Sequence, residues 1–511
     1  MKKNFKIIFS IVGVIIAAFL LKSDTLLCNI FGIVGIYLCI YLFMKTVMSI
    51  LELKCFYLKE IITILVAYNL QKSSYLLYKN ISKENMYLIP NVIMIILFSS
   101  IFFYNLYKDN RIKKDEILNL CYEYLIMSIP FYIIKSRGRQ TLILVCLMIL
   151  LNIFLKKKYI FDESIKKIYI IVFFLIIFSG TSFIGNENVK FQIDSYKHFF
   201  ENLIFLIIFT QIKLSKLDLK KFITVGMIAS IIPIIPIIVE FLRVRNFSYR
   251  LGEDNPNIWA MEAILWTIIY LYIVLFKNKR EFTIMYILYL IGVFLSGSRG
   301  AILTVLVINF FIFIYRYRKQ KKILCSIFIA ILLVSLGILN TNNRISYTIN
   351  LIKNEKKLDN STSIRKIVYQ EAFDQFKIKP INGFGFDGYR KTSIKRNLEN
   401  KTREFSYIEE NAYSQEHAHN SLLNLLCGTG LLGTVSYLVM LFFIYKKVYL
   451  EKKTIEGLFI TMLMVSYEMY GLVECTIRYY NVQRFLYLII GIYIAYTTPK
   501  ISFSKKEKLE Q

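Results

Sequence analysis

The chain has 511 residues, of which 56% are hydrophobic and 19% are charged, and its formal net charge is +29. Soluble domains of this size are rarely so apolar, so the composition excludes an ordinary globular protein and predicts an integral membrane protein. Most of the positive charge lies in short segments between apolar runs, which indicates membrane topology and argues against a nucleic-acid partner.

Apolar runs of roughly 15 to 22 residues recur along the chain, and each is about long enough to cross a hydrocarbon core ~30 Å thick as a helix. Backbone groups in lipid must bond within their own segment, so we predict an all-α polytopic protein with about 14 to 16 transmembrane helices. The run in residues 1–21 resembles a signal peptide but lacks a clean cleavage site, so we expect it to stay as the first span. The predicted spans lie near residues 5–21, 25–44, 57–76, 86–107, 117–135, 140–155, 168–183, 198–212, 222–240, 258–276, 282–296, 301–315, 323–339, 420–445, 455–474 and 484–497.

Basic residues in alternate loops predict the orientation of these spans, because cytoplasmic loops carry an excess of Lys and Arg. With both termini in the cytoplasm, the basic segments 156–158, 220–221, 277–280, 316–322 and 446–453 all face the cytoplasm. The same threading predicts that residues 340–418 form one large extracytoplasmic loop of about 80 residues, long enough to be a subdomain. The predicted parts are amino-terminal helices 1–220, arginine-bearing helices 221–339, the loop 340–418, carboxy-terminal helices 419–498 and a cytoplasmic basic tail 499–511.

Within the loop, residues 363–377 alternate apolar and charged side chains with the period of an amphipathic helix. Pro380 and the run Gly383-Phe384-Gly385 predict the turn that ends it. The glycines superficially resemble a nucleotide-binding loop, but no strand is predicted before them, so a backbone turn is the better interpretation. The eight cysteines lie in or beside apolar runs, which predicts no disulfide framework.

Arginines at the predicted outer ends of spans are unexpected, because outward loops are usually poor in basic residues. They are Arg243, Arg245, Arg250 and Arg299. Snorkelling to the membrane interface is one explanation. Arg299 follows Ser296-Gly297-Ser298 between two predicted spans that are each short for a crossing, which suggests a turn recessed below the surface. A guanidinium held there suits phosphate oxygens through paired hydrogen bonds.

Two of the three histidines, His417 and His419, lie together where the predicted outer loop meets the next span. Imidazole is the side chain best suited to accept a proton near neutral pH. A solvated or helix-capping pair is one alternative. A metal site is another, with Glu409, Glu410 and Glu416 close in sequence, but the chain lacks a helical His-x-x-x-His pair, so we predict no metal and no cofactor.

Four segments, in order, resemble the superfamily of O-antigen ligases and Wzy-type O-antigen polymerases. The resemblance covers roughly residues 220 to 445, and it is specific in the order and spacing of its parts. The segments are Arg250-Leu251-Gly252 with Asn255-Pro256-Asn257; Ser298-Arg299-Gly300; Arg365 at the start of the loop helix that ends at Pro380 and Gly383-Phe384-Gly385; and His419-Asn420 with Leu423 and Gly430-Leu431-Leu432-Gly433.

This resemblance implies a GT-C-like glycosyltransferase of the cytoplasmic (inner) membrane with an extracytoplasmic active site. Its donor would be a glycan carried on a polyisoprenyl diphosphate such as undecaprenyl diphosphate, and its acceptor a glycan or lipid-linked glycan, joined with inversion and without a metal. Carried over by motif, Arg250, Arg299 and Arg365 would bind the diphosphate and His419 would be catalytic. Supporting roles are expected for His417, Asn420, Glu416 and Asn257.

Ligase and polymerase differ only in the acceptor, and no residue identifies it. We favour a ligase, with a polymerase that extends the lipid-linked glycan as the alternative. A flippase of lipid-linked oligosaccharides would also use intramembrane arginines, but it should be built from two repeated halves without a large outer loop. A non-catalytic scaffold would leave the arginines and histidines without a role.

The predicted orientation is testable with a reporter fused after Asn360. A reporter that works only outside the cytoplasm should be active at this position, and one that works only in the cytoplasm should be inactive. The reason is that only this register places the basic segments in the cytoplasm. A second fusion after Lys322 should report the cytoplasm. Cytoplasmic activity of the Asn360 fusion would contradict both the topology and the site.

Overall fold

A computed structural model describes residues 2–21, 26–51, 59–67, 88–108, 162–184, 189–212, 216–244, 250, 255–320, 322, 360–399, 404–451 and 453–498. These residues form helices and connecting turns, with no β-strand among them. They fall into two compact units. The first unit comprises residues 1–158 and 214–297, and the second unit comprises residues 159–213 and 298–511.

The first unit consists of long apolar helices. In it α1 packs against α2, and α11 packs against α12. Trp266, Tyr270 and Tyr289 stack in its interior with ring centroids 5.9 to 6.1 Å apart. The helices are α1 (Lys2–Leu20), α2 (Leu26–Ile50), α4 (Leu88–Lys108), α9 (Lys216–Ala229), α10 (Ile231–Val244), α11 (Pro256–Phe276), η2 (Arg280–Phe282) and α12 (Thr283–Leu295).

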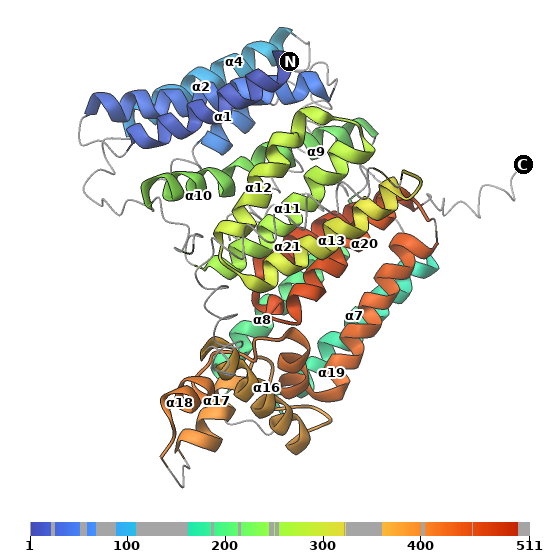
Figure 1. The fold of residues 1–511 in the computed structure, drawn as a ribbon. Coiled ribbons are helices and arrows are strands. Elements are labelled where there is room, and N and C mark those ends of the chain that lie inside the picture. The colour runs from blue at the N-terminus through green and yellow to red at the C-terminus, as the bar shows by residue number, and fades with distance from the viewer. Residues whose placement is uncertain are drawn as a thin grey trace, which may run out of the picture. The chain divides into compact units, whose positions relative to one another are not determined.

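The second unit contains the described part of the predicted outer loop and the carboxy-terminal helices, joined by two helices from the amino-terminal half of the chain. Here α7 packs along α19, α8 along α21, and α13 along α20 (Figure 1). The helices are α7 (Glu163–Thr181), α8 (Val189–Phe209), α13 (Arg299–Tyr317), α16 (Asn360–Ile378), α17 (Tyr389–Ser393), η4 (Ile394–Glu399), α18 (Tyr407–Tyr413), α19 (Ser421–Tyr445), η5 (Lys446–Leu450), α20 (Ile455–Gly471), η6 (Thr476–Arg478) and α21 (Tyr480–Thr497).

The predicted membrane character and helical fold are confirmed. Among the described residues, six helices are long and apolar enough to cross a membrane, and these candidate spans are 30–50, 163–181, 219–242, 256–276, 299–317 and 421–450. The total number of spans stays a prediction, because those expected near 117–135, 140–155 and 323–339 lie outside the described residues, as does the tail 499–511. The sequence-based domain boundaries also stay predictions. The compact units group the helices differently, with α7 and α8 in the second unit.

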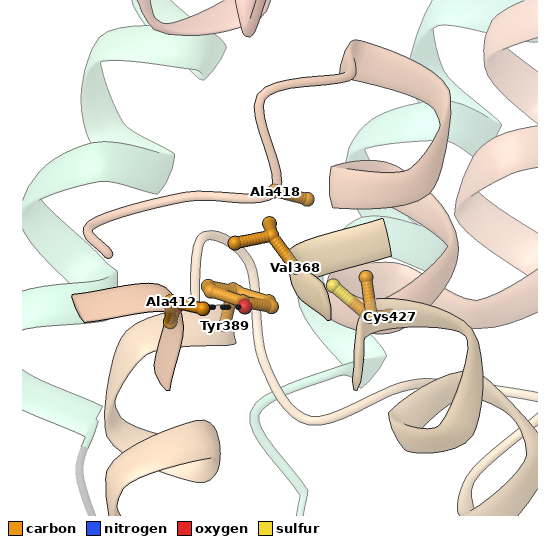
Figure 2. Close-up of a cluster of buried hydrophobic side chains, with 6 residues drawn as sticks. Val368, Tyr389, Ala412, Ala418 and Cys427 are labelled. Carbon is orange, nitrogen blue, oxygen red and sulfur yellow. Dashed lines mark hydrogen bonds between the residues drawn. The ribbon is translucent and has the colours of Figure 1, made fainter. Parts of the chain in front are cut away.

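The described part of the predicted outer loop, with His419 and Asn420, is called the loop subdomain (residues 360–399 and 404–420), and it shares a hydrophobic core with α19 (Figure 2). Val368 and Ala372 of α16, Tyr389 of α17, Ala412 of α18 and Cys427 of α19 meet there, together with Ala418 between the two histidines, and all six are fully buried. The Tyr389 hydroxyl donates to the Ala412 carbonyl at 3.5 Å. The amphipathic helix expected at 363–377 is therefore confirmed as α16, and it contributes its buried face to this core.

The turn after α16 docks on a break in α19. Gly430 has φ of +62°, which interrupts the helix and frees backbone groups on both sides. The segment 380–385 satisfies them: Leu431 N–H donates to the Pro380 carbonyl at 2.8 Å, and Gly385 N–H donates to the Gly428 carbonyl at 2.9 Å. The predicted glycine turn is confirmed, because Gly383 and Gly385 also have positive φ.

Gly383→Ala is expected to destabilise the protein. Gly383 has φ of +68°, and a Cβ there would collide with the Gly428 carbonyl, which is backbone and cannot rotate away. The left-handed conformation alone costs about 1–2 kcal/mol for a residue with a Cβ. Thermal unfolding of the purified variant should therefore begin at a lower temperature than that of the wild type.

Gly226→Ala is the matched control for this variant. Gly226 lies inside α9, and a Cβ there would meet nothing within 4 Å. We expect no loss of stability and a gain of up to about 1 kcal/mol, because alanine favours a helix interior. Equal melting temperatures for Gly383→Ala and the wild type would contradict the docking of the turn on α19.

Candidate functional site

Glu474 lies at the centre of a cluster of charged side chains in the second unit. It follows α20 in the turn that leads to η6, and its side chain is only 3% exposed. Its Oε1 lies 2.9 Å from His419 Nδ1, and its Oε2 lies 3.6 Å from Arg365 Nη2. The backbone N–H of Cys475 also donates to Oε1, at 3.2 Å. One buried carboxylate thus joins a histidine and an arginine that are 54 positions apart in the sequence.

The ring of His419 is held at both nitrogens. Nδ1 faces Glu474, and Nε2 lies 3.0 Å from Gln415 Oε1. The Gln415 amide is oriented by Asn411, whose carbonyl accepts from Gln415 Nε2 at 2.9 Å, so the oxygen of the amide faces the ring. His419 also has φ of +48°, a conformation that non-glycine residues adopt mostly where their surroundings enforce it. Both contacts and the backbone therefore fix this imidazole.

His417 is held as a neutral ring beside His419. The two ring centroids are 4.4 Å apart. Burial, together with the positive charge of His419, lowers the pKa of His417 to about 3. Its Nδ1 accepts from the backbone N–H of His419 at 3.2 Å, so the single ring proton of the neutral form lies on Nε2. His417 thus supports the backbone of His419 instead of carrying a charge.

His417, His419 and Glu474 have ligand atoms within 4.8 Å of one another, which makes them a candidate metal-binding group among the described residues. The hydrogen bonds do not favour a metal. His417 Nε2, which faces Glu474 at 3.9 Å, carries the ring proton in the arrangement above and is therefore not a free ligand. For His417 to bind a metal through Nε2, its ring proton would have to move to Nδ1, which already accepts the backbone N–H of His419. In a typical metal-binding histidine, the nitrogen that does not bind the metal donates a hydrogen bond.

The partners of Glu474 also decide its protonation. Burial alone would raise the pKa of Glu474, but the hydrogen bond and charge of His419, helped by His417 and Arg365, hold that pKa below its ordinary value of 4.5. The carboxylate is therefore charged at neutral pH.

A second group of charged residues lies around Arg478 and is linked to the histidine segment through Asn424. Arg478 of η6 lies 3.2 Å from Asp387 and 3.2 Å from Glu416. Asp387 is buried at φ of +60°, where it accepts from the Ser195 hydroxyl of α8 at 2.9 Å. Burial raises the pKa of Asp387, and Arg478 opposes that effect. Asn424 completes the network, because its Oδ1 accepts from the Ala418 N–H at 3.2 Å.

Three acidic or amide residues near the histidines have structural contacts of their own. Asn420 caps α19, since its side chain accepts from the Leu423 N–H, and its amide donates to the Leu472 carbonyl at 2.9 Å. Glu409 forms a capping box with Ser406 at the start of α18. Glu416 pairs with Arg478. The carboxylate that contacts the His419 ring, Glu474, was not predicted.

Of the three predicted diphosphate arginines, Arg365 is brought to the histidines by Glu474. Arg299 begins α13, and the flanking Ser298 hydroxyl lies 3.0 Å from the Tyr470 hydroxyl. A Cβ on Gly300 would collide with Val473, so the Arg299 turn packs beside the segment that carries Glu474. The expectation that both flanking helices are short is confirmed for α12, which has 13 residues, and wrong for α13, which has 19.

Arg250 belongs to the first unit, together with Asn257. Its Nη2 donates to Asn257 Oδ1 at 2.6 Å, and its Nε donates to the Ser296 carbonyl at 3.1 Å. A Cβ on Gly297, which has φ of +62°, would lie 3.0 Å from the Arg250 side chain. Arg250 is therefore held against the turn that precedes Arg299 in sequence, and Asn257 orients its guanidinium.

Sequence reasoning missed Glu474, Arg478 and Gln415, and it assigned nothing to α8. A signal for Glu474 was present, because it is an acidic residue at the end of the predicted span 455–474. Ionisable residues at such positions are rare unless they are paired. The contribution of Ser195 had no comparable signal.

Comparison with known proteins agrees with this geometry. Residues 284–438 match the family model described as O-antigen ligase (Wzy_C). The match includes Arg299, Arg365, His417 and His419 and ends before Glu474. Proteins with this domain are ligases and polymerases that act on lipid-linked glycans. No curated protein matches the chain.

Glu474→Gln should remove a pH-dependent part of the stability. Because the folded pKa of Glu474 is held below its ordinary value of 4.5, its carboxylate stabilises the fold above that pH, and the contribution is lost as pH falls through the folded pKa. We expect the variant to melt well below the wild type at pH 7 and the difference to shrink at pH 4 and below.

Glu410→Gln is the control, since Glu410 is an exposed glutamate of α18. Its melting temperature should equal that of the wild type at both pH values. A Glu474→Gln deficit that stayed constant with pH would mean that the carboxylate charge is not what stabilises the cluster.

Proposed function

We propose that the chain is an O-antigen ligase-like glycosyltransferase that transfers a polyisoprenyl-diphosphate-linked glycan to an acceptor on the outer side of the cytoplasmic membrane. The observation that carries the proposal is the shared carboxylate of Glu474, which links Arg365 to His419. These are residues with complementary roles in such a transfer: a cation for a departing phosphate, and a base for an attacking hydroxyl.

On the donor side, the bond between the anomeric carbon and the diphosphate oxygen breaks. The leaving diphosphate needs no proton, but its growing negative charge must be met by cations already in position. Arg365 is about one-third exposed, at 31%, and Glu474 lies against only one edge of its guanidinium. The other N–H groups are directed to the diphosphate in this proposal. Arg250 and Arg299 serve the same group.

On the acceptor side, a sugar hydroxyl forms the new bond and gives up its proton. Nδ1 of His419 is engaged with Glu474, so Nε2 is the nitrogen that accepts this proton. Gln415 Oε1 is an acceptor at Nε2, so Nε2 carries a proton in this arrangement. In the proposal the ring gives up this proton before the acceptor binds, and the acceptor hydroxyl then takes the place of Gln415 and donates to the free Nε2. The proton goes from the acceptor oxygen to Nε2, and the resulting imidazolium is stabilised by Glu474. A single displacement of this kind inverts the anomeric centre.

The identity of the acceptor separates a ligase from a polymerase. The family description favours ligation, in which the acceptor is another lipid-linked saccharide or glycolipid. A polymerase would use the same arginines and the same base with a growing lipid-linked glycan as acceptor. Mass analysis of the surface glycan from a deletion strain distinguishes them, since loss of attachment and loss of chain length differ in mass.

The test of the mechanism is transfer by the full-length protein reconstituted with a lipid-linked donor in the presence of EDTA. We expect His419→Ala to lose about 10²-fold to 10⁴-fold in rate, which is the usual value of a positioned base. His417→Ala is the matched control from the same turn. It should keep most of the rate, because His417 is neutral and supports only the backbone.

Two results would contradict the proposal. Transfer by His419→Ala at the wild-type rate would exclude the histidine as base. Loss of wild-type transfer on addition of EDTA, with recovery on addition of Zn²⁺, would mean that His417, His419 and Glu474 hold a metal.

A further inference from the structure

The end of α16 presents an unusual apolar surface for a loop that is predicted to lie outside the membrane. Phe373, Ile378 and Ile381 are exposed, the last two at 56% and 64%. Phe373 and Ile378 belong to α16 and Ile381 to the turn that follows it, and none of the three is part of the core of the loop subdomain. Exposed aliphatic side chains at this density usually have a partner.

Hydrogen bonds locate this surface relative to α19. The Leu431 N–H donates to the Pro380 carbonyl at 2.8 Å, and the Leu432 N–H donates to the Ile381 carbonyl at 3.2 Å. Leu431 is itself exposed, and it begins a stripe of exposed apolar residues along one face of α19. The stripe comprises Leu431, Val435, Leu438 and Phe442. Because α19 is a candidate span, this stripe is a surface that faces lipid.

The length of α19 sets the depth of that stripe. The candidate span runs from Ser421 to Leu450, which is longer than a hydrocarbon core requires. Residues 421–430 are mostly buried in protein, and they include the polar Asn424 and Thr429. Lys446 and Lys447, which are predicted to face the cytoplasm, mark the inner boundary of the hydrocarbon. From Leu431 to Tyr445 the helix covers about 15 residues, or roughly 22 Å at 1.5 Å per residue, which is less than a core ~30 Å thick. Leu431, and Ile381 beside it, therefore lie within the outer leaflet, roughly 8 Å below the outer boundary of the hydrocarbon.

The basic residues at the end of α16 match the phosphate-rich layer above that depth. Lys377 Nζ lies 4.7 Å from the centroid of the Phe373 ring, and Lys379 Nζ lies 4.9 Å from that of Phe384. Lys377 also pairs with Asp374 at 3.1 Å. Lysines that extend over aromatic rings beside exposed aliphatic side chains are typical of a membrane interface.

We propose that the end of α16 and the turn 378–381 insert into the outer leaflet of the bilayer. Phe373, Ile378 and Ile381 contact acyl chains, and Lys377 and Lys379 contact the phosphates of the lipid headgroups. The partner is the phospholipid bilayer, because the surface is continuous with the lipid-facing stripe of α19. The loop subdomain is thus seated on the membrane, and this inference does not depend on the proposed reaction.

The test is quenching of tryptophan fluorescence by brominated phospholipids in the full-length protein, reconstituted at one copy per nanodisc. The chain has two tryptophans, so Trp259→Phe with Trp266→Phe gives a background without tryptophan. Ile381→Trp is then the probe and Leu438→Trp the positive control. Tyr407→Trp is the matched negative control, because Tyr407 is even more exposed, at 77%, but begins α18.

We expect lipids brominated near the headgroup end of the chain to quench Ile381→Trp strongly, since interfacial side chains lie only about 5–10 Å below the headgroup boundary. Leu438→Trp should respond best to deeper bromines, and Tyr407→Trp should not respond. Ile378→Trp provides a second probe if Ile381→Trp does not fold. Failure of both probes to be quenched, with Leu438→Trp quenched, would overturn the proposal. The proposal would also be overturned if the probes were protected from a water-soluble quencher only in nanodiscs that hold several copies. That result would assign the surface to a second copy of the chain.

Discussion

The contact between Glu474 and His419 is the interaction on which the site depends. A carboxylate with 3% exposure is costly to bury unless cations and hydrogen bonds compensate it. Its partners come from separate segments, since Arg365 lies in α16 and His419 immediately precedes α19. Removing one member of such a buried pair commonly costs about 3–5 kcal/mol. The same carboxylate therefore holds the His419 ring, pairs with Arg365, and ties the loop subdomain to the end of α20.

The break in α19 makes this arrangement possible. An unbroken helix would leave no backbone donors or acceptors for the turn 380–385, and the loop subdomain would have only side-chain contacts to hold it. Gly430 supplies the break, and Gly383 supplies the close approach to the Gly428 carbonyl. Ala418 lies between the two histidines in the sequence. Because it is buried in the core of the loop subdomain, it restricts the positions of His417 and His419. The reactive ring is thus positioned by backbone hydrogen bonds and core packing, which deform less than a surface loop.

Local signals in the sequence were sufficient to predict the helix and the turn of the loop subdomain. The period of residues 363–377 predicted α16, the glycines predicted the turn, and the motif spacing related Arg365 to His419. Ser195 was out of reach because its importance comes from long-range packing. Glu474 had a signal in its position at the end of a predicted span, but its partners in α16 and before α19 come from long-range packing that the sequence does not show. Asn420 illustrates a different difficulty. A residue next to a histidine at the start of a helix suits both a ligand-binding role and a helix cap, and the backbone geometry gives it the cap.

The central claim, that one carboxylate couples the phosphate-binding arginine to the base, is tested most directly by a double-mutant cycle on the transfer rate. The variants are Arg365→Lys, Glu474→Gln and the two combined, assayed with the same lipid-linked donor. If the claim is right, the loss in the double variant is smaller than the product of the single losses, with an interaction energy of about 1 kcal/mol or more. Losses that multiply would mean that Arg365 and Glu474 act independently, so that the carboxylate does not couple the arginine to the rest of the site.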